Sequence, residues 1–105
     1  MDFSDLSDAG LEKTIAATSS PLLISFRTNG NKRCKDVEDW LIKQRYKEKL
    51  RLGRIDVDKY PETRTRFSIL GLPNLVLFKG SVERRTGWIG PWLEESLQEF
   101  LKPYL

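Results

Sequence analysis

The feature that most constrains the fold is a short apolar run that stops at a polar turn and is followed at once by a helix-like pattern. The run, 22–26, has the length and apolar content of a strand that is covered on both faces of a parallel sheet. Gly30 lies in the turn, and Asn31 is a good helix N-cap because its side-chain oxygen can accept an orphan backbone N–H. The sequence therefore predicts a central strand, a loop and a helix N-terminus.

The single cysteine, Cys34, falls at the third position of that predicted helix. Unpaired backbone N–H groups and the positive end of the helix dipole favour a thiolate there. Cys34 is thus either a reactive monothiol or an inert, buried, small apolar residue, and we favour the second interpretation. The cations around it are Arg27, Lys32, Arg33 and Lys35, which form either an anion or acidic-partner site or, as we favour, a solvated rim.

Composition excludes several classes of protein. Of the 105 residues, 39% are hydrophobic and 31% are charged, which is typical of a globular chain, and we expect one domain over 1–105. A net charge of +3 without a basic and aromatic stripe gives no indication of a nucleic-acid partner. The apolar runs 22–24 and 75–78 are far shorter than the roughly 20 residues that span a bilayer, so we expect no membrane partner.

The cysteine and histidine counts bear on compartment and chemistry. One cysteine cannot form an internal disulfide, and the start of the chain has neither a basic nor an apolar leader segment, so we expect a cytoplasmic protein. The absence of histidine excludes His-based metal sites and His general bases. We expect no cofactor and no metal.

The remaining pattern predicts alternating helices and strands. Helices are expected at about 7–17, 31–47, 60–67 and 93–102, and strands at 22–26, 51–58, 74–79 and 82–86, the last two as an antiparallel hairpin. In the second helix, Val37 and Leu41 are expected to face the core with Cys34, whereas Glu38 is grouped with the charged residues that mostly face away. The order is α-β-α-β-α-β-β-α.

Several motifs in this order carry a family resemblance. They are Pro21 to Phe26, the Cys34-Lys35 pair, Arg54 to Asp58, Gly71-Leu72-Pro73 and Leu77-Phe78-Lys79. From about Asp8 to the C-terminus the chain resembles thioredoxin. The resemblance implies an α/β thioredoxin-like fold, in which helices flank a central mixed sheet. It also implies that Pro73 is a cis proline beside the active site.

The resemblance does not extend to the residues that carry out thiol chemistry in the family. The family motif Trp-Cys-Gly-Pro-Cys is matched by Gly30-Asn31-Lys32-Arg33-Cys34, so the attacking cysteine has become Asn31. Dithiol exchange needs one thiolate to attack and a second to resolve the mixed disulfide. The buried family aspartate that helps to deprotonate the second cysteine is matched by Ser25. The resemblance therefore implies that thioredoxin-type reduction has been abandoned.

The function predicted from these departures is protein binding at the groove around the former active site. In the family, the backbone beside the cis proline can pair with an extended peptide, so the expected partner is another protein or an extended peptide segment, bound by a monomer. The expected binding residues are Gly30, Asn31, Lys32, Arg33, Leu72, Pro73, Trp88, Gly90 and Trp92. Trp88 and Trp92, expected in a loop of the groove, are either aromatic anchors or ordinary packing residues. The alternative function is a monothiol redox protein that forms mixed disulfides through Cys34.

Overall fold

The computed structural model describes residues 3–44, 49–80, 82–88 and 94–105 of the chain. Along the sequence the elements are β1 (Ser4–Asp5), α1 (Asp8–Ala17), β2 (Leu22–Arg27), α2 (Lys32–Lys43), β3 (Arg51–Asp56), α3 (Pro61–Arg66), β4 (Asn74–Lys79), β5 (Val82–Trp88), α4 (Glu94–Leu101) and a 3₁₀ turn (Lys102–Tyr104). Among the described residues, no helix is long and apolar enough to cross a membrane.

The five strands form one mixed sheet in the order β1-β3-β2-β4-β5. β3 runs parallel to both β1 and β2, whereas β4 is antiparallel to β2 and β5 is antiparallel to β4. The apolar run therefore becomes the central strand, as predicted, and all five residues 22–26 are buried. Together with helices on both faces, this confirms the predicted α/β, thioredoxin-like architecture.

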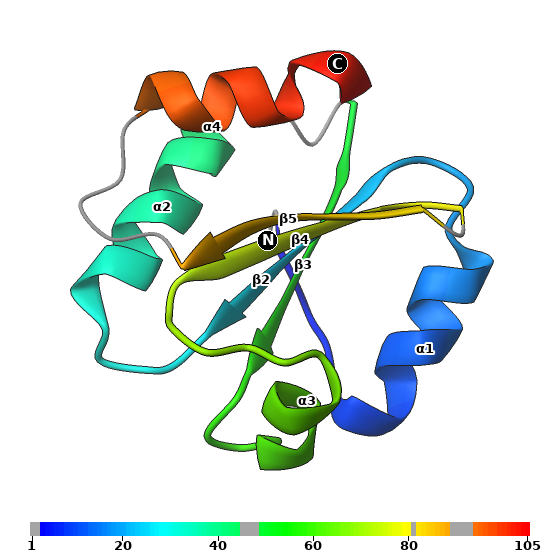
Figure 1. The fold of residues 1–105 in the computed structure, drawn as a ribbon, viewed down its shortest axis with the longest axis vertical. Helices are drawn as coiled ribbons and strands as arrows, with labels where there is room; N and C mark the ends of the chain where they lie inside the picture. The colour runs from blue at the N-terminus through cyan, green and yellow to red at the C-terminus, as the bar shows by residue number, and fades with distance from the viewer. Residues whose placement is uncertain (1–2, 45–48, 81, 89–93) are drawn as a thin grey trace.

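The sheet separates two apolar layers because side chains alternate between its faces. Figure 1 shows α2 and α4 on one side of the sheet and α1 and α3 on the other. One layer contains Leu23, Leu75 and Leu77 of the sheet with Val37, Trp40 and Leu41 of α2 and Leu97 and Leu101 of α4. The other contains Leu22, Ile24, Phe26, Val76 and Phe78 of the sheet with Leu11 of α1.

Helix starts follow the capping residues of the sequence. Ser7 caps α1 by accepting a hydrogen bond from the backbone N–H of Gly10 at 3.1 Å, and Asn31 caps α2. Pro61 lies at the first turn of α3, where its missing N–H removes no helical bond. These local signals explain why the helix starts were predictable.

Three boundaries differ from the sequence-based prediction. The predicted order lacks β1, whose two residues pair with Gly53 and Arg54 and are too few for a periodic signal. The helix expected to reach about 47 ends at Lys43, and residues 45–48 lie outside the described part. β5 continues to Trp88 because Trp88 pairs with Asn74, beyond a bulge at Leu75/Val76, so Trp88 ends a strand and is not a loop residue.

Replacing Leu77 with alanine should lower the free energy of unfolding by about 3 kcal/mol, because its side chain is fully buried in the centre of the sheet. Leu70→Ala is the matched control, since Leu70 is an exposed leucine and its truncation should change stability by less than about 0.5 kcal/mol. Chemical denaturation of both variants measures the difference. Equal losses would contradict this assignment of the core.

Candidate functional site

The candidate site lies where three strand ends meet. β2 ends at Arg27, and the pairing of Phe26 with Asn74 sets this end beside Pro73, immediately before β4. The pairing of Asn74 with Trp88 brings the end of β5 to the same place. Figure 1 shows these strand ends on the side where the chain enters α2. The topology therefore brings the α2 N-terminus and the Pro73 turn to the same end of the central strands.

The turn into α2 has a defined geometry. Gly30 is exposed with φ +81°, in the left-handed region that disfavours other residues. Asn31 follows, and its Oδ1 accepts a hydrogen bond from the backbone N–H of Cys34 at 3.1 Å. The residue that matches the attacking cysteine of the family is thus a helix cap, and its carboxamide cannot attack a disulfide.

Cys34 occupies the third helical position and is fully buried, with a relative exposure of 0%; both the position and the burial agree with the interpretation favoured from the sequence. Burial raises the pKa of the thiol, and the nearby Glu38 carboxylate raises this pKa further. A hydrogen bond from the Thr28 backbone and the charges of Arg27 and Arg33 lower the pKa, but less than burial raises it. Desolvation thus outweighs these opposing effects, and the thiol form is favoured at neutral pH.

The peptide bond between Leu72 and Pro73 is cis, as the resemblance implied. Pro73 is buried and Leu72 is half-buried. β5 ends at Trp88, whereas Gly90 and Trp92 lie outside the described residues, so their place in the site stays a prediction.

Most of the cations near Cys34 already have carboxylate partners. Lys32 Nζ lies 2.9 Å from Asp36 Oδ2, and Lys35 Nζ lies 2.8 Å from Asp39 Oδ2, both one turn along the helix. Arg33 is exposed, and no carboxylate of the described residues pairs with it. Only Arg33 of these side chains offers an uncompensated charge, which agrees better with a solvated rim than with a strong anion site.

The sequence analysis did not predict Glu38 as a site residue. It grouped Glu38 with the residues that mostly face away from the core, and this predicted orientation was wrong. Its relative exposure is only 3%. Its carboxylate accepts hydrogen bonds from Ser25 Oγ at 3.1 Å, Arg27 Nε at 2.8 Å and Arg54 Nη1 at 3.3 Å. Glu38 follows Cys34 by four residues and therefore shares its helix face, which is the signal that could have revealed it.

The Glu38 cluster, which we define as Glu38 with Ser25, Arg27 and Arg54, links several elements at the site. Arg54 also pairs with Asp5 of β1, and this guanidinium lowers the pKa of the Asp5 carboxyl. Arg27 Nη1 donates a second hydrogen bond to Asn29 Oδ1 at 2.9 Å, in the turn before α2. The cluster therefore connects the sheet, α2 and the loop that positions the cap.

A polar hollow of about 420 Å³ lies beside this cluster, at the carboxyl ends of the parallel strands. Its cations are Arg27, Arg54 and Lys59, and its carboxylates are Asp5 and Asp56. Glu38 pairs with both arginines from the protein side, so Asp5, Asp56 and Glu38 together balance the three cations, and the hollow has no clear preference for ligand charge. Within the described residues, no group of three Cys, Asp or Glu side chains is arranged to hold a metal ion.

Replacing Glu38 with alanine should lower the free energy of unfolding by about 3 kcal/mol, because two largely buried guanidinium groups and Ser25 each lose one acceptor. Asp39→Ala is the neighbouring control. Its exposed pair with Lys35 is worth less than about 0.5 kcal/mol. Denaturant titration of both variants at neutral pH checks the contrast, and a Glu38→Ala variant as stable as Asp39→Ala would exclude a structural role for the cluster.

Comparisons with known proteins agree with this fold. The thioredoxin family model matches residues 2–103. The thioredoxin of Buchnera aphidicola subspecies Baizongia pistaciae is 32% identical over 103 residues, covering 96% of this chain and 94% of the relative. The thioredoxin of Acidithiobacillus ferridurans is 29% identical, covering 95% and 94%. The crystal structure of chloroplastic thioredoxin z superposes with a TM-score of 0.81 at 22% identity, covering 99% of this chain and 95% of that one. Because the thioredoxin family model matches nearly the whole chain, the chain belongs to the thioredoxin family.

Proposed function

We propose that this chain is a thioredoxin-family protein that binds another protein at the former active-site groove and does not reduce disulfides with a dithiol. The observation that carries the proposal is the use of Asn31 as the cap of α2, at the position of the attacking thiol, above a fully buried Cys34. A mixed disulfide needs an accessible thiolate to attack, and its release needs a second thiol. The chain has one thiol, and that thiol is shielded.

The arrangement of the backbone at this site is compatible with binding without this chemistry. Gly30, Lys32 and Arg33 are exposed at the start of α2, and the Leu72-Pro73 turn lies at the same end of the central strands. We propose that an extended segment pairs with the backbone beside Pro73, and that neighbouring surfaces select its side chains. The resemblance to thioredoxin implies that Trp88, Gly90 and Trp92 also belong to this groove, and we include them in the proposed binding surface.

The second candidate is a monothiol redox protein that forms mixed disulfides through Cys34. It is favoured by the Thr28 hydrogen bond and the charges of Arg27 and Arg33, all of which lower the pKa of the thiol. Burial opposes it, because thiol chemistry requires access as well as ionisation. Either function suits a monomer in the cytoplasm, where a reducing environment keeps a lone thiol free.

The native thiol should react slowly with iodoacetamide near neutral pH, and the rate should rise at alkaline pH, because burial raises the pKa of Cys34 and blocks access. The same protein should not accelerate insulin reduction beyond dithiothreitol alone. Unfolded protein in guanidinium is the control and should react at the rate of a free cysteine. Fast labelling of the native protein would promote the monothiol function.

Partner binding should depend on the aromatic side of the groove more than on the thiol. Trp88→Ala or Trp92→Ala should weaken the affinity for a partner recovered from cell extract by about thirtyfold, as expected for loss of an aromatic anchor. Cys34→Ser should bind nearly as well, provided that circular dichroism shows normal folding. Unchanged affinity in both tryptophan variants, with loss in Cys34→Ser, would exclude this groove as the binding surface.

A further inference from the structure

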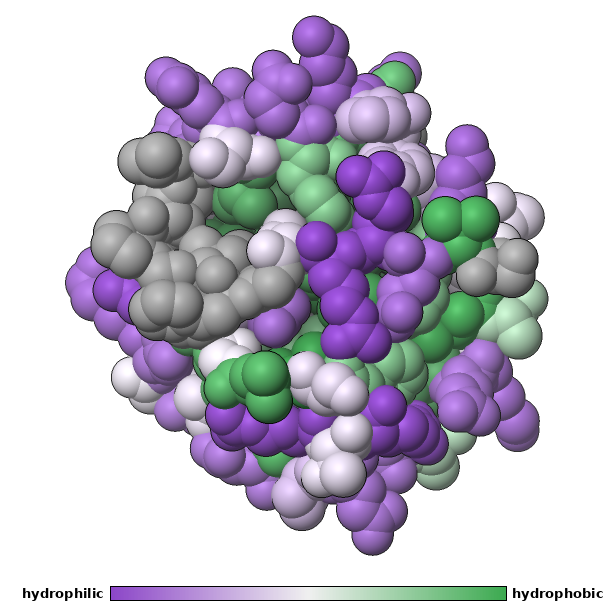
Figure 2. All heavy atoms as spheres, viewed as in Figure 1, coloured by the Kyte–Doolittle hydropathy of each residue, from purple (hydrophilic) through white to green (hydrophobic). Residues whose placement is uncertain are grey.

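The loop between α3 and β4 presents an apolar side chain to solvent. Leu70 has a relative exposure of 90%, whereas its neighbour Ile69 is 2% exposed and packs in the core. Figure 2 shows a small hydrophobic area over this loop, with hydrophilic residues beside it. A single exposed leucine is common on protein surfaces, so exposure alone indicates no function. The surroundings of Leu70 carry the inference.

The loop is held in one conformation by hydrogen bonds on both sides of Ser68. Arg64 Nε donates to the Ile69 carbonyl at 3.1 Å, and the Ile69 N–H donates to the Arg64 carbonyl at 2.9 Å. Arg85 of β5 donates to the Phe67 carbonyl. Ser68 has φ +54°, a left-handed conformation that a serine adopts rarely and that costs free energy. Leu70 is therefore presented on a pre-organised loop, which reduces the entropy lost on binding.

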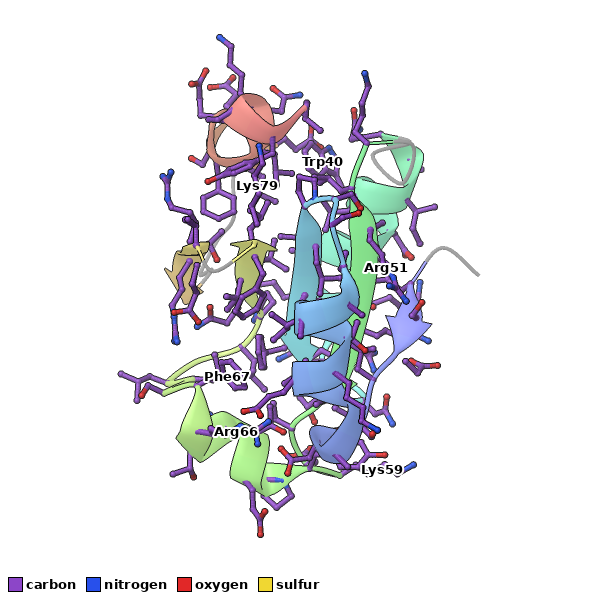
Figure 3. The ribbon with its side chains drawn as sticks, turned by 90° about the vertical axis from the view of Figure 1, so that its right-hand side faces the viewer. Trp40, Arg51, Lys59, Arg66, Phe67 and Lys79 are labelled. Atoms are coloured by element: carbon purple, nitrogen blue, oxygen red, sulfur yellow. The ribbon has the colours of Figure 1, made fainter. Side chains whose placement is uncertain are left out.

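The charges around the loop are unequal. Arg66, whose guanidinium lies 5.3 Å from the centre of the Phe67 ring, pairs with Asp8 at 3.3 Å, and Figure 3 shows Arg66 and Phe67 together at the end of α3. Arg85 pairs with Glu83 at 3.1 Å. Arg64 makes a hydrogen bond to the Ile69 carbonyl, but no carboxylate of the described residues pairs with it. Its terminal nitrogens leave a half-buried positive charge beside the loop.

We propose that Leu70 and Arg64 form a docking site for an extended protein segment that carries a carboxylate next to a large apolar side chain. The apolar side chain covers Leu70, and the carboxylate pairs with the terminal nitrogens of Arg64, whose position is set by the Ile69 carbonyl. Only Gly71 and Leu72 separate Leu70 from Pro73, so the site continues the groove. The inference rests on the proposed binding function and names the chemistry of the partner.

The probe is a phage-displayed library of random linear peptides, selected on the intact protein. The peptides that bind should share a carboxylate adjacent to a large apolar residue. Affinities of synthetic copies are then measured by calorimetry for the unmodified protein, Leu70→Ala and Arg64→Gln. Each variant should bind about tenfold more weakly, as expected for loss of one central contact. Salt should weaken binding to the unmodified protein, and Arg64→Gln should lose part of this salt dependence.

Matched variants separate docking from folding. Leu70→Met keeps a large apolar side chain and should bind the peptides about as tightly as the unmodified protein. Val82→Ala removes another exposed apolar side chain, at 55% exposure, and should also leave the affinity unchanged. Arg33→Glu tests the groove near α2. Loss of binding in Arg33→Glu with unchanged affinity in Leu70→Ala and Arg64→Gln would overturn the docking site but keep the proposed function. Failure to select any binding peptide would overturn both.

Discussion

The hydrogen-bonded ion cluster centred on Glu38 is the interaction on which the site depends. A carboxylate buried in a helix–sheet interface is costly unless its oxygens are paired and hydrogen-bonded, and here Ser25, Arg27 and Arg54 satisfy them. These donors come from two neighbouring strands, so the cluster fixes α2 against the sheet. Through Asn29, Arg27 also reaches the turn that leads to the cap of α2. The position of the former active-site turn is therefore set by electrostatic contacts beneath it.

This cluster also changes the chemistry that the fold can support. The family places a buried carboxylate at the position of Ser25, whereas this chain carries the carboxylate on α2, one turn after Cys34. Burial is the largest cause that raises the pKa of the Cys34 thiol, and the negative charge of Glu38 raises this pKa further. Three donors occupy the Glu38 carboxylate. Asn31 completes the change, because a side chain that caps the helix has replaced the attacking thiol.

The exposed surface of the site, unlike the buried Glu38 cluster, depends little on ion pairs. Exposed charges at the start of α2 are mostly compensated by carboxylates one helical turn away, and such pairs contribute little to stability. The loop before Pro73 instead combines a restrained backbone with an exposed leucine and a cation that no described carboxylate neutralises. In the proposed binding function, apolar and charged contacts of this kind select the partner by shape and charge, and they require no reactive group.

The sequence by itself determined the elements whose signals are local. The apolar run 22–26 indicated the central strand, Ser7 and Asn31 indicated helix starts, and the thioredoxin motifs indicated the fold and the cis proline. The missing attacking cysteine was equally plain. Only the tertiary structure decided the state of Cys34 and Glu38. Helical spacing alone did not show that arginines from two strands converge on Glu38, or that the sheet removes Cys34 from solvent. The sequence analysis also missed β1 and the end of β5 at Trp88. These strand ends are defined by pairing with strands distant in the sequence and not by a local pattern.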